Sequence, residues 1–228
     1  MASGRLRALL GDEQGAVIVE VTAAILLFFV LLGGIVDGSM LFYQWNATTK
    51  AVQIGARLAA VSLPVASNLT GLTGITGSNL PGDPMPAFDC TCTGTSDTSG
   101  TCTGTVPTGA TACTYNADNM NRLIRGRNFI PGQECTDLAR DPSVAKTQYI
   151  GMCDYFPTIT PNNVRVRYQY TGLGYAGRPG GPVPTITVSV RNLTFNYVFL
   201  QPLLGKLPVS LPGFNTTVTG EDLKQDGS

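Results

Sequence analysis

The sequence predicts an α+β protein in which one long N-terminal helix, partly in a membrane, packs on a small antiparallel β-sheet domain linked by disulfides. Three observations support this fold class. Residues 16–36 form an apolar run of twenty-one residues with one ionisable side chain, Glu20. Residues 164–170 and 185–191 alternate apolar and polar side chains, as half-buried strands do. Six cysteines follow the apolar run, and cysteines on the outer side of a membrane usually form disulfides because that compartment is oxidising.

The composition argues against nucleic-acid binding and against most enzyme chemistry. Lysine plus arginine and aspartate plus glutamate number 15 each, so the formal net charge is zero and no basic face indicates nucleic acid. The chain has no histidine, which removes the commonest general base and the commonest metal ligand. We therefore expect no nucleic-acid partner, no cofactor, no metal and no catalytic residue.

The apolar run is long enough to cross a membrane, because about 1.5 Å of rise per residue carries it through a hydrocarbon core of roughly 30 Å. A short polar leader, residues 1–15, precedes it and contains Arg5 and Arg7. The next basic residue is Lys50, on the other side of the run. This asymmetry places the N-terminus in the cytoplasm and the rest of the chain outside.

Glu20 is unusual in such a run. A carboxylate costs about 2.5–3.5 kcal/mol at the centre of a membrane span and less near its edge. Either Glu20 lies at the level of the lipid headgroups, or it has a function that outweighs this cost.

The helix is predicted to continue beyond the membrane, over residues 16–62 in all. Asp37-Gly38 marks the membrane exit, but an apolar spacing of three to four residues persists through Trp45, Val52 and Gly55. Pro64 stops the helix, because the residue before a proline is biased away from helical geometry. The aromatic residues Phe42, Tyr43 and Trp45 fit an interfacial belt and fit packing against the domain equally well.

Residues 63–115 are predicted to be a loop insertion rich in threonine, glycine and cysteine, because such a composition buries too little apolar surface to fold unaided. The disulfide candidates are Cys90, Cys92, Cys102, Cys113, Cys135 and Cys153. Six cysteines allow fifteen pairings, and the sequence does not select one. We expect Cys135 to pair with Cys153, and the first four to cross-link the insertion. A zinc site at Cys90-Thr-Cys92 is disfavoured by its C-x-C spacing.

Residues 116–228 are predicted to form the extracytoplasmic α+β domain. A helix is expected near residues 118–125, ending at Gly126, and a β-hairpin is expected over residues 164–197. The hairpin loop contains Gly172-x-Gly174-x-x-Gly177, a dinucleotide-type spacing. The prolines and glycines that follow exclude the helix that a dinucleotide site requires. Asp97-x-Ser99-x-Thr101 has the spacing of a metal-adhesion motif, but no apolar strand precedes it.

Gly15-Ala-Val-Ile-Val-Glu20 resembles the type IV pilin-like leader, in which a prepilin peptidase cuts after the glycine and leaves glutamate at the fifth mature position. Together with the span and the later segment Gly55-Ala56-Arg57, the sequence resembles the TadE-like family. Those proteins are minor pilins, or pilin-like assembly proteins, of tight-adherence (Flp-type) pilus systems. The resemblance implies processing between Gly15 and Ala16, and pairing of Glu20 with the Ala16 amine of a neighbouring subunit.

The resemblance also implies partners and a location. The expected partners are a prepilin peptidase, other pilin subunits, the pilus assembly machinery and the bacterial inner membrane. The protein is expected to cross that membrane once, with its C-terminal domain in the periplasm or incorporated in a pilus. The alternative is an uncleaved, signal-anchored surface protein whose outer domain binds a partner or a surface.

Overall fold

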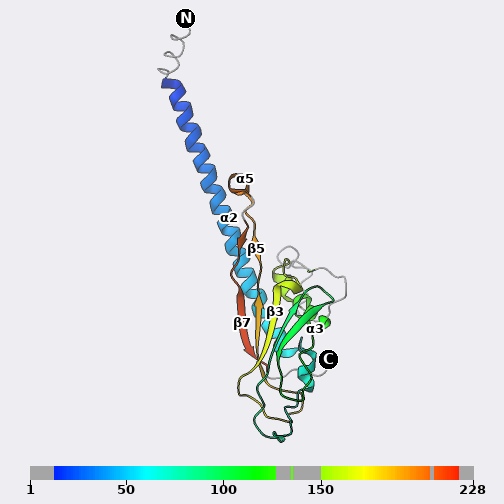
Figure 1. Cartoon of the computed structure of the whole chain (residues 1–228). Coiled ribbons are helices and arrows are strands. Elements are labelled where there is room, and N and C mark those ends of the chain that lie inside the picture. The colour runs from blue at the N-terminus through cyan, green and yellow to red at the C-terminus, as the bar shows by residue number, and fades with distance from the viewer. Residues whose placement is uncertain (1–12, 127–134, 136–149, 206–207, 221–228) are drawn as a thin grey trace. The chain divides into compact units, whose positions relative to one another are not determined.

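The structure, a computed structural model, describes residues 13–126, 135, 150–205 and 208–220. It divides into two compact units. One contains the N-terminal part of the long helix, up to Tyr43, together with Phe195–Val209; the other contains Gln44–Thr194 and the C-terminal strand. The element order is shown in Figure 1. A long apolar helix, an antiparallel sheet and three disulfides confirm the predicted fold class.

The long helix is α2, Glu13–Val61. It begins three residues earlier than predicted, inside the expected leader, and it ends one residue earlier, before Leu63 and Pro64. Two glycine positions, Gly33 and Gly34, lie within it without interrupting it. In the described residues it is the one helix that is long and apolar enough to cross a membrane.

The second unit contains a five-stranded antiparallel sheet with the strand order β2-β1-β3-β4-β7. Its strands are β1 (Asp89–Gly94), β2 (Gly100–Thr105), β3 (Val164–Tyr170), β4 (Pro184–Val190) and β7 (Phe214–Thr219). The predicted alternation of β3 and β4 is confirmed, because Val164, Val166 and Tyr168 are buried and their neighbours Arg165 and Arg167 are not.

The expectation that residues 63–115 form only a loop insertion is wrong for residues 89–105. Strand β1 pairs with β3 along its length and lies between β2 and β3 in the sheet. Its inward positions are filled by Cys90 and Cys92, both 0% exposed. Half-cystines therefore supply the buried face that valine or isoleucine supplies in β3, while the intervening threonines suit a strand backbone.

The predicted hairpin 164–197 is correct for its two long strands but ends earlier than expected. Strands β3 and β4 pair from Val164 opposite Val190 to Tyr170 opposite Pro184. The chain then turns at Asn192, whose φ is 58°. Residues after the turn belong to β5 (Thr194–Phe195), which pairs with β6 (Val209–Ser210) in a separate two-stranded sheet. The short helix α5, Gln201–Leu204, lies between β5 and β6.

Short helices complete the domain: η1 (Ser67–Gly71), α3 (Ala117–Arg125), α4 (Met152–Tyr155) and η3 (Pro161–Asn163). The helix predicted at 118–125 is α3. The Asn116 side chain accepts a hydrogen bond from the Asn119 amide at its start, and Gly126, at φ 93°, ends it. Buried Tyr168 ties the sheet to the segment after α2, because its hydroxyl accepts a hydrogen bond from the Val65 amide at 2.9 Å. Burial raises the pKa of Tyr168, so its hydroxyl remains protonated.

Candidate functional site

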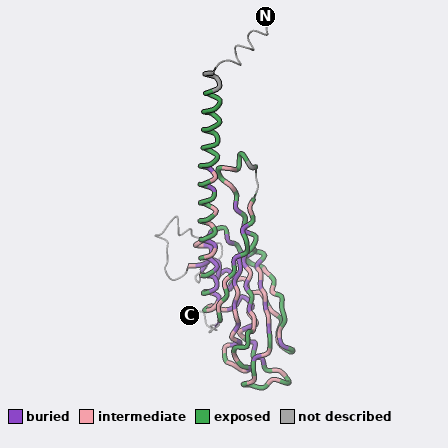
Figure 2. Tube along the Cα trace, turned by 90° about the vertical axis from the view of Figure 1, so that its left-hand side faces the viewer, coloured by how far each residue is buried: buried purple, intermediate pink, exposed green. Residues whose placement is uncertain are grey.

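The N-terminal part of α2 is an exposed apolar surface. Figure 2 shows exposed residues along this part of the helix, and buried positions appear further along it. The large side chains are well exposed, for example Val19 at 69% and Leu27 at 70%. Glu20 lies on this helix with its side chain exposed. Gly15 and Ala16 lie in the first turns of α2, so the predicted processing position and Glu20 belong to one continuous helix.

The small-residue segment of α2 has the opposite character. Ala51, Ala56 and Ala59 are at most 1% exposed, and Gly55 is also buried. A Cβ atom at Gly55 would lie 2.5 Å from the Met152 Sδ atom of α4, so glycine allows α4 to approach the helix closely. Two of the three predicted family-motif residues, Gly55 and Ala56, thus face the interior of the domain.

Arg57, the third motif residue, points away from this interior. Its side chain is exposed. In the described part of the chain, no hydrogen bond or ion pair holds its guanidinium. Among the described residues, the motif therefore combines two packing positions with one exposed cation.

The aromatic residues near the end of the predicted span divide between the two roles that the sequence left open. The Trp45 ring packs edge-on against Phe214 of β7, with the ring centroids 4.9 Å apart. Phe42 and Tyr43 are more exposed, at 69% and 56%. Packing within the domain thus accounts for Trp45, whereas the exposure of Phe42 and Tyr43 is compatible with a membrane interface.

Asp37 has a role that the sequence did not reveal. It is 1% exposed and its carboxylate accepts hydrogen bonds from three consecutive backbone amides. Val198 donates to Oδ1 at 2.9 Å, Leu200 donates to Oδ2 at 2.9 Å, and Phe199 donates to both oxygens at 3.2 Å. Since these partners are more than 160 residues away in sequence, spacing along the chain gave no signal of this contact.

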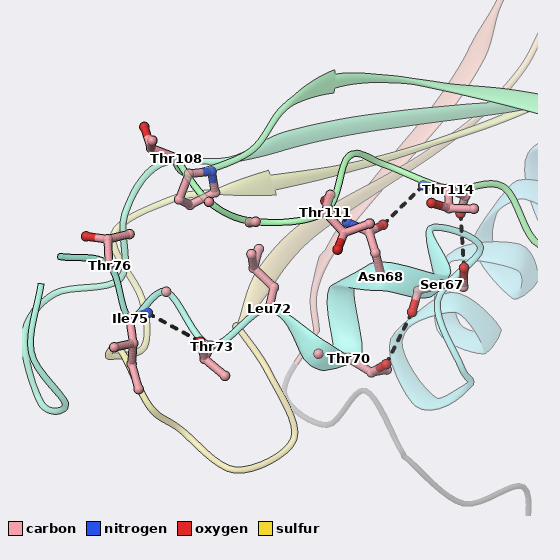
Figure 3. Close-up of a pocket in the computed structure, with 15 residues that line it drawn as sticks. Ser67, Asn68, Thr70, Leu72, Thr73, Ile75, Thr76, Thr108, Thr111 and Thr114 are labelled. Atoms are coloured by element: carbon pink, nitrogen blue, oxygen red, sulfur yellow. Dashed lines mark hydrogen bonds between the residues drawn. The ribbon is translucent and has the colours of Figure 1, made fainter.

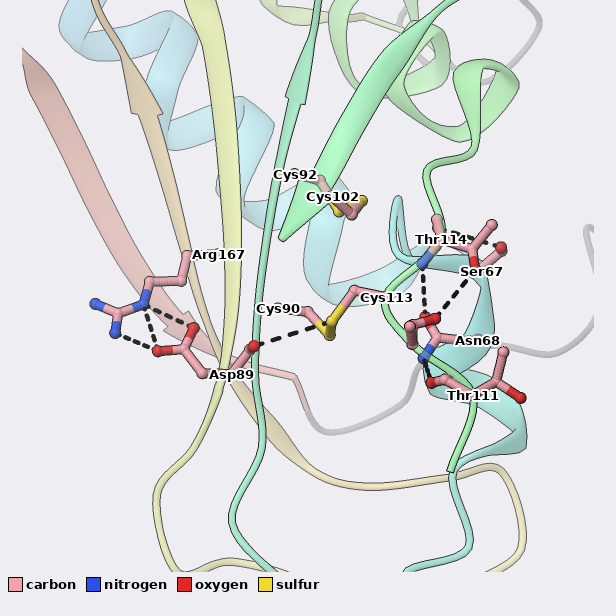
Figure 4. Close-up of a disulfide and its surroundings, with 11 residues drawn as sticks. Ser67, Asn68, Asp89, Cys90, Cys92, Cys102, Thr111, Cys113, Thr114 and Arg167 are labelled. Atoms are coloured by element: carbon pink, nitrogen blue, oxygen red, sulfur yellow. Dashed lines mark hydrogen bonds and ion pairs between the residues drawn. A yellow bond between two sulfur atoms is a disulfide. The ribbon is translucent and has the colours of Figure 1, made fainter. Parts of the chain in front are cut away.

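All six cysteines form disulfides in the structure. The pairs are Cys90–Cys113, Cys92–Cys102 and Cys135–Cys153. Cys92 and Cys102 are directly opposite each other on β1 and β2. The close-up in Figure 4 shows the first two bridges side by side, with Cys113 joining the strand β1 to the segment that carries Thr111 and Thr114. The Cys92–Cys102 bridge cross-links two neighbouring strands of the sheet, and the Cys90–Cys113 bridge attaches the segment after β2 to β1.

Two ion pairs stabilise the same region. Asp89 at the start of β1 forms a bidentate pair with Arg167 of β3 (Figure 4), and this carboxylate raises the pKa of Arg167. Asp97, in the turn between β1 and β2, pairs with Arg125 of α3 at 2.7 Å. Asp97 belongs to the spacing that resembled a metal-adhesion motif, and here it contacts an arginine. Burial, together with the Asp97 charge, raises the pKa of nearby Tyr115 to about 12.

A groove of about 530 Å³, with both polar and apolar residues in its lining, lies beside these bridges, between η1 and the segment after β2. Figure 3 shows threonine hydroxyls and the Asn68 side chain around it. Asn68 is held in place because its amide nitrogen donates to the Thr111 carbonyl at 2.8 Å and its oxygen accepts from the Thr114 amide at 3.2 Å. The groove has neutral hydrogen-bonding groups and no carboxylate or cationic side chain in its lining.

In the ranges that the structure describes, no group of three or more histidine, cysteine, aspartate or glutamate side chains could hold a metal ion. The distinctive surfaces are the exposed apolar helix with Glu20, the exposed Arg57 and the neutral groove.

These features define a protein with one N-terminal helix of membrane-crossing length joined to a disulfide-linked α+β domain. The family model described as TadE-like protein matches residues 15–57, which confirms the resemblance to the TadE-like family in this segment. The match includes the exposed part of α2 and the small-residue segment, but no strand of the sheet. A comparison with curated proteins and a comparison with solved structures each found no match.

Proposed function

We propose that the protein is a minor pilin, or a pilin-like assembly protein, of a Tad (Flp-type) pilus, processed by a prepilin peptidase between Gly15 and Ala16. The observation that carries this proposal is the exposed apolar half of α2 with its one carboxylate, Glu20, five residues after Gly15. The TadE-like match over residues 15–57 supports the association with a Tad pilus. The large outer domain favours a minor role over that of the bulk subunit, because the major pilins of these systems are short helices.

In the proposed mechanism, the membrane stores the subunit until its helix joins a bundle of neighbouring helices. The amine that cleavage creates at Ala16 of one subunit pairs with the Glu20 carboxylate of the next. An ammonium and a carboxylate attract far more strongly in a low-dielectric environment than in water, and each removes the other's cost of being buried alone. The pair therefore sets the register between neighbouring helices.

The central test replaces Glu20. We expect Glu20→Ala to insert into the membrane normally but to be lost from sheared pilus fractions, because the partner amine would be left unpaired. Thr22→Ala is the matched control, since Thr22 lies in the next half-turn and its hydroxyl bonds only to its own helix at Ile18. Immunoblots of membrane and pilus fractions report both steps. Normal incorporation of Glu20→Ala would refute the register mechanism.

The alternative is an uncleaved, signal-anchored binding protein, and the neutral groove beside η1 favours it as a second candidate. Its hydroxyl and amide groups suit an uncharged polar ligand such as a sugar. The mature N-terminus distinguishes the two functions. N-terminal sequencing that finds Ala16 first only when the peptidase is present would support the pilin function. If the leader is retained both with and without the peptidase, the pilin function is contradicted.

A further inference from the structure

The segment between β5 and β6 returns to α2 beside the part of the helix that is predicted to lie in the membrane. We name residues 198–204 the apolar tip, because Gln201 is the one polar residue in the sequence Val-Phe-Leu-Gln-Pro-Leu-Leu. The apolar tip and this part of α2 belong to the same compact unit, and Figure 1 shows α5 beside α2. A Cβ atom at Gly33 would lie 3.2 Å from the Phe199 Cβ, so the two backbones approach closely.

The apolar tip has large apolar side chains on its surface. Val198, Phe199 and Leu203 are 56%, 58% and 64% exposed. Between the tip and the helix lies a groove of about 420 Å³. The residues that line it are all of apolar types and include Phe29, Val36, Phe199 and Leu203. Exposed large apolar side chains that gather in this way indicate an interaction surface.

The groove extends along about half of the length of the predicted membrane span. Its lining on α2 extends from Leu26 to Val36, which are ten residues apart. At about 1.5 Å of rise per residue this is about 15 Å, or half of a hydrocarbon core of roughly 30 Å. If the helix crosses a membrane, the apolar tip must enter the same layer.

The first three amides of the apolar tip meet the requirement that this layer imposes. In hydrocarbon, an amide group without a partner costs several kcal/mol, and irregular backbone is tolerated there only when its polar groups are paired. The Asp37 carboxylate pairs with the amides of Val198, Phe199 and Leu200, the three at the start of the tip. In turn, these amides compensate a carboxylate that is 1% exposed at the end of an apolar span.

We propose that the apolar tip is a second membrane-embedded element, and that lipid acyl chains of the leaflet nearest Asp37 occupy the groove between the tip and α2. Lipid is favoured over a second copy of the chain because the tip continues the exposed apolar surface of the span. Through its hydrogen bonds to the three amides, Asp37 holds the apolar tip against the helix. The inference requires membrane insertion of α2 but is independent of pilus assembly.

Tryptophan fluorescence tests this proposal, because Trp45 is the one tryptophan in the chain. In full-length protein that carries Trp45→Phe, we would place the reporter at Phe199→Trp and, separately, at Leu203→Trp. Both are expected to emit at shorter wavelength in phosphatidylcholine vesicles and to lose emission when the acyl chains are brominated. The matched control is Leu80→Trp, because Leu80 is 68% exposed in a loop of the other unit.

The control should resist brominated lipid and respond to aqueous acrylamide. Quenching of both tip reporters by acrylamide instead of brominated lipid would overturn the proposal. Protection from both quenchers would overturn it as well, and would indicate a second copy in the groove.

The role of Asp37 in holding the apolar tip is tested separately. Asp37→Ala in the Phe199→Trp protein is expected to lower quenching by brominated lipid and to raise quenching by acrylamide, because three amides lose their acceptor. Ser39→Ala is the control, since the Ser39 hydroxyl bonds to its own helix at Ile35. Unchanged quenching in Asp37→Ala would overturn the role of Asp37.

Discussion

The two halves of α2 solve different physical problems with the same backbone. In residues 17–36 the helix presents large side chains to its surroundings, whereas in residues 44–61 it buries small ones within a domain. The contrast is clear between two valines of the same helix: Val19 is 69% exposed and Val52 is 1% exposed.

The difference relates the size of the side chains in each half of α2 to the surroundings of that half. Large aliphatic and aromatic side chains are suited to hydrocarbon, where they need no protein partner. Alanine and glycine are suited to contact with a folded domain, because they let another backbone approach. The family match over residues 15–57 includes both kinds of surface, so one sequence signature describes an exposed apolar surface and a buried one.

The largest expected effect comes from removing a disulfide in the domain that packs against residues 44–61 of α2. Cys135→Ala with Cys153→Ala removes a disulfide that closes eighteen residues and holds α4, whose Met152 contacts Gly55. Loop-closure entropy predicts a loss of about 3 kcal/mol in the free energy of unfolding. Urea unfolding of the full-length protein in detergent, followed by Trp45 emission, measures it. Carbonate extraction should show unaltered membrane insertion, and an unchanged unfolding midpoint would contradict the prediction.

An intermediate effect compares the two valines directly. We expect Val52→Ala to lower the free energy of unfolding by about 2 kcal/mol, because a fully buried aliphatic side chain is truncated. The same truncation at Val19 should change it by less than about 0.5 kcal/mol, because the side chain is exposed. Both variants are measured in the same detergent by the emission of Trp45. Equal effects would mean that the two halves do not differ as their burial indicates.

Sequence reasoning was most successful where one side chain type reports one environment. The apolar run, the alternation of Val164, Val166 and Tyr168 and the cap at Gly126 each follow a local pattern, and all are present in the structure. Strand β1 was missed although Cys90 and Cys92 alternate with threonines. The reason is that the threonine- and glycine-rich sequence around it is typical of a loop, and the pairing of β1 with β3 joins residues that are distant in sequence.

The candidate site was harder to predict because its parts are distant in sequence. The predicted processing position, Glu20 and the small-residue motif lie within one helix, so their spacing can be read from the sequence. The bond between Asp37 and the amides of residues 198–200 joins segments more than 160 residues apart. An aspartate at the end of a span fits an ordinary membrane exit, so its buried role depends on tertiary structure alone.

The smallest expected effect comes from adding a single methyl group to the buried half of α2. Gly55→Ala adds a Cβ atom 2.5 Å from the Met152 Sδ, and overpacking of about 1–3 kcal/mol should exceed the helix-propensity gain of up to about 1 kcal/mol. A net loss of about 1 kcal/mol in the free energy of unfolding is expected. At Gly38, which has no neighbour within 4 Å of the added atom, the same substitution should not lower stability.

A double-mutant cycle assigns this effect to its contact. In a Met152→Ala background the added methyl group has room, so Gly55→Ala should cause no further loss and could then recover its helix-propensity gain. Trp45 emission during urea unfolding gives all four free energies. If Gly55→Ala were equally destabilising in both backgrounds, its cost would come from elsewhere than α4. The small-residue motif would then not be explained by packing within one chain, and the buried half of α2 would have to be considered as a surface for another subunit.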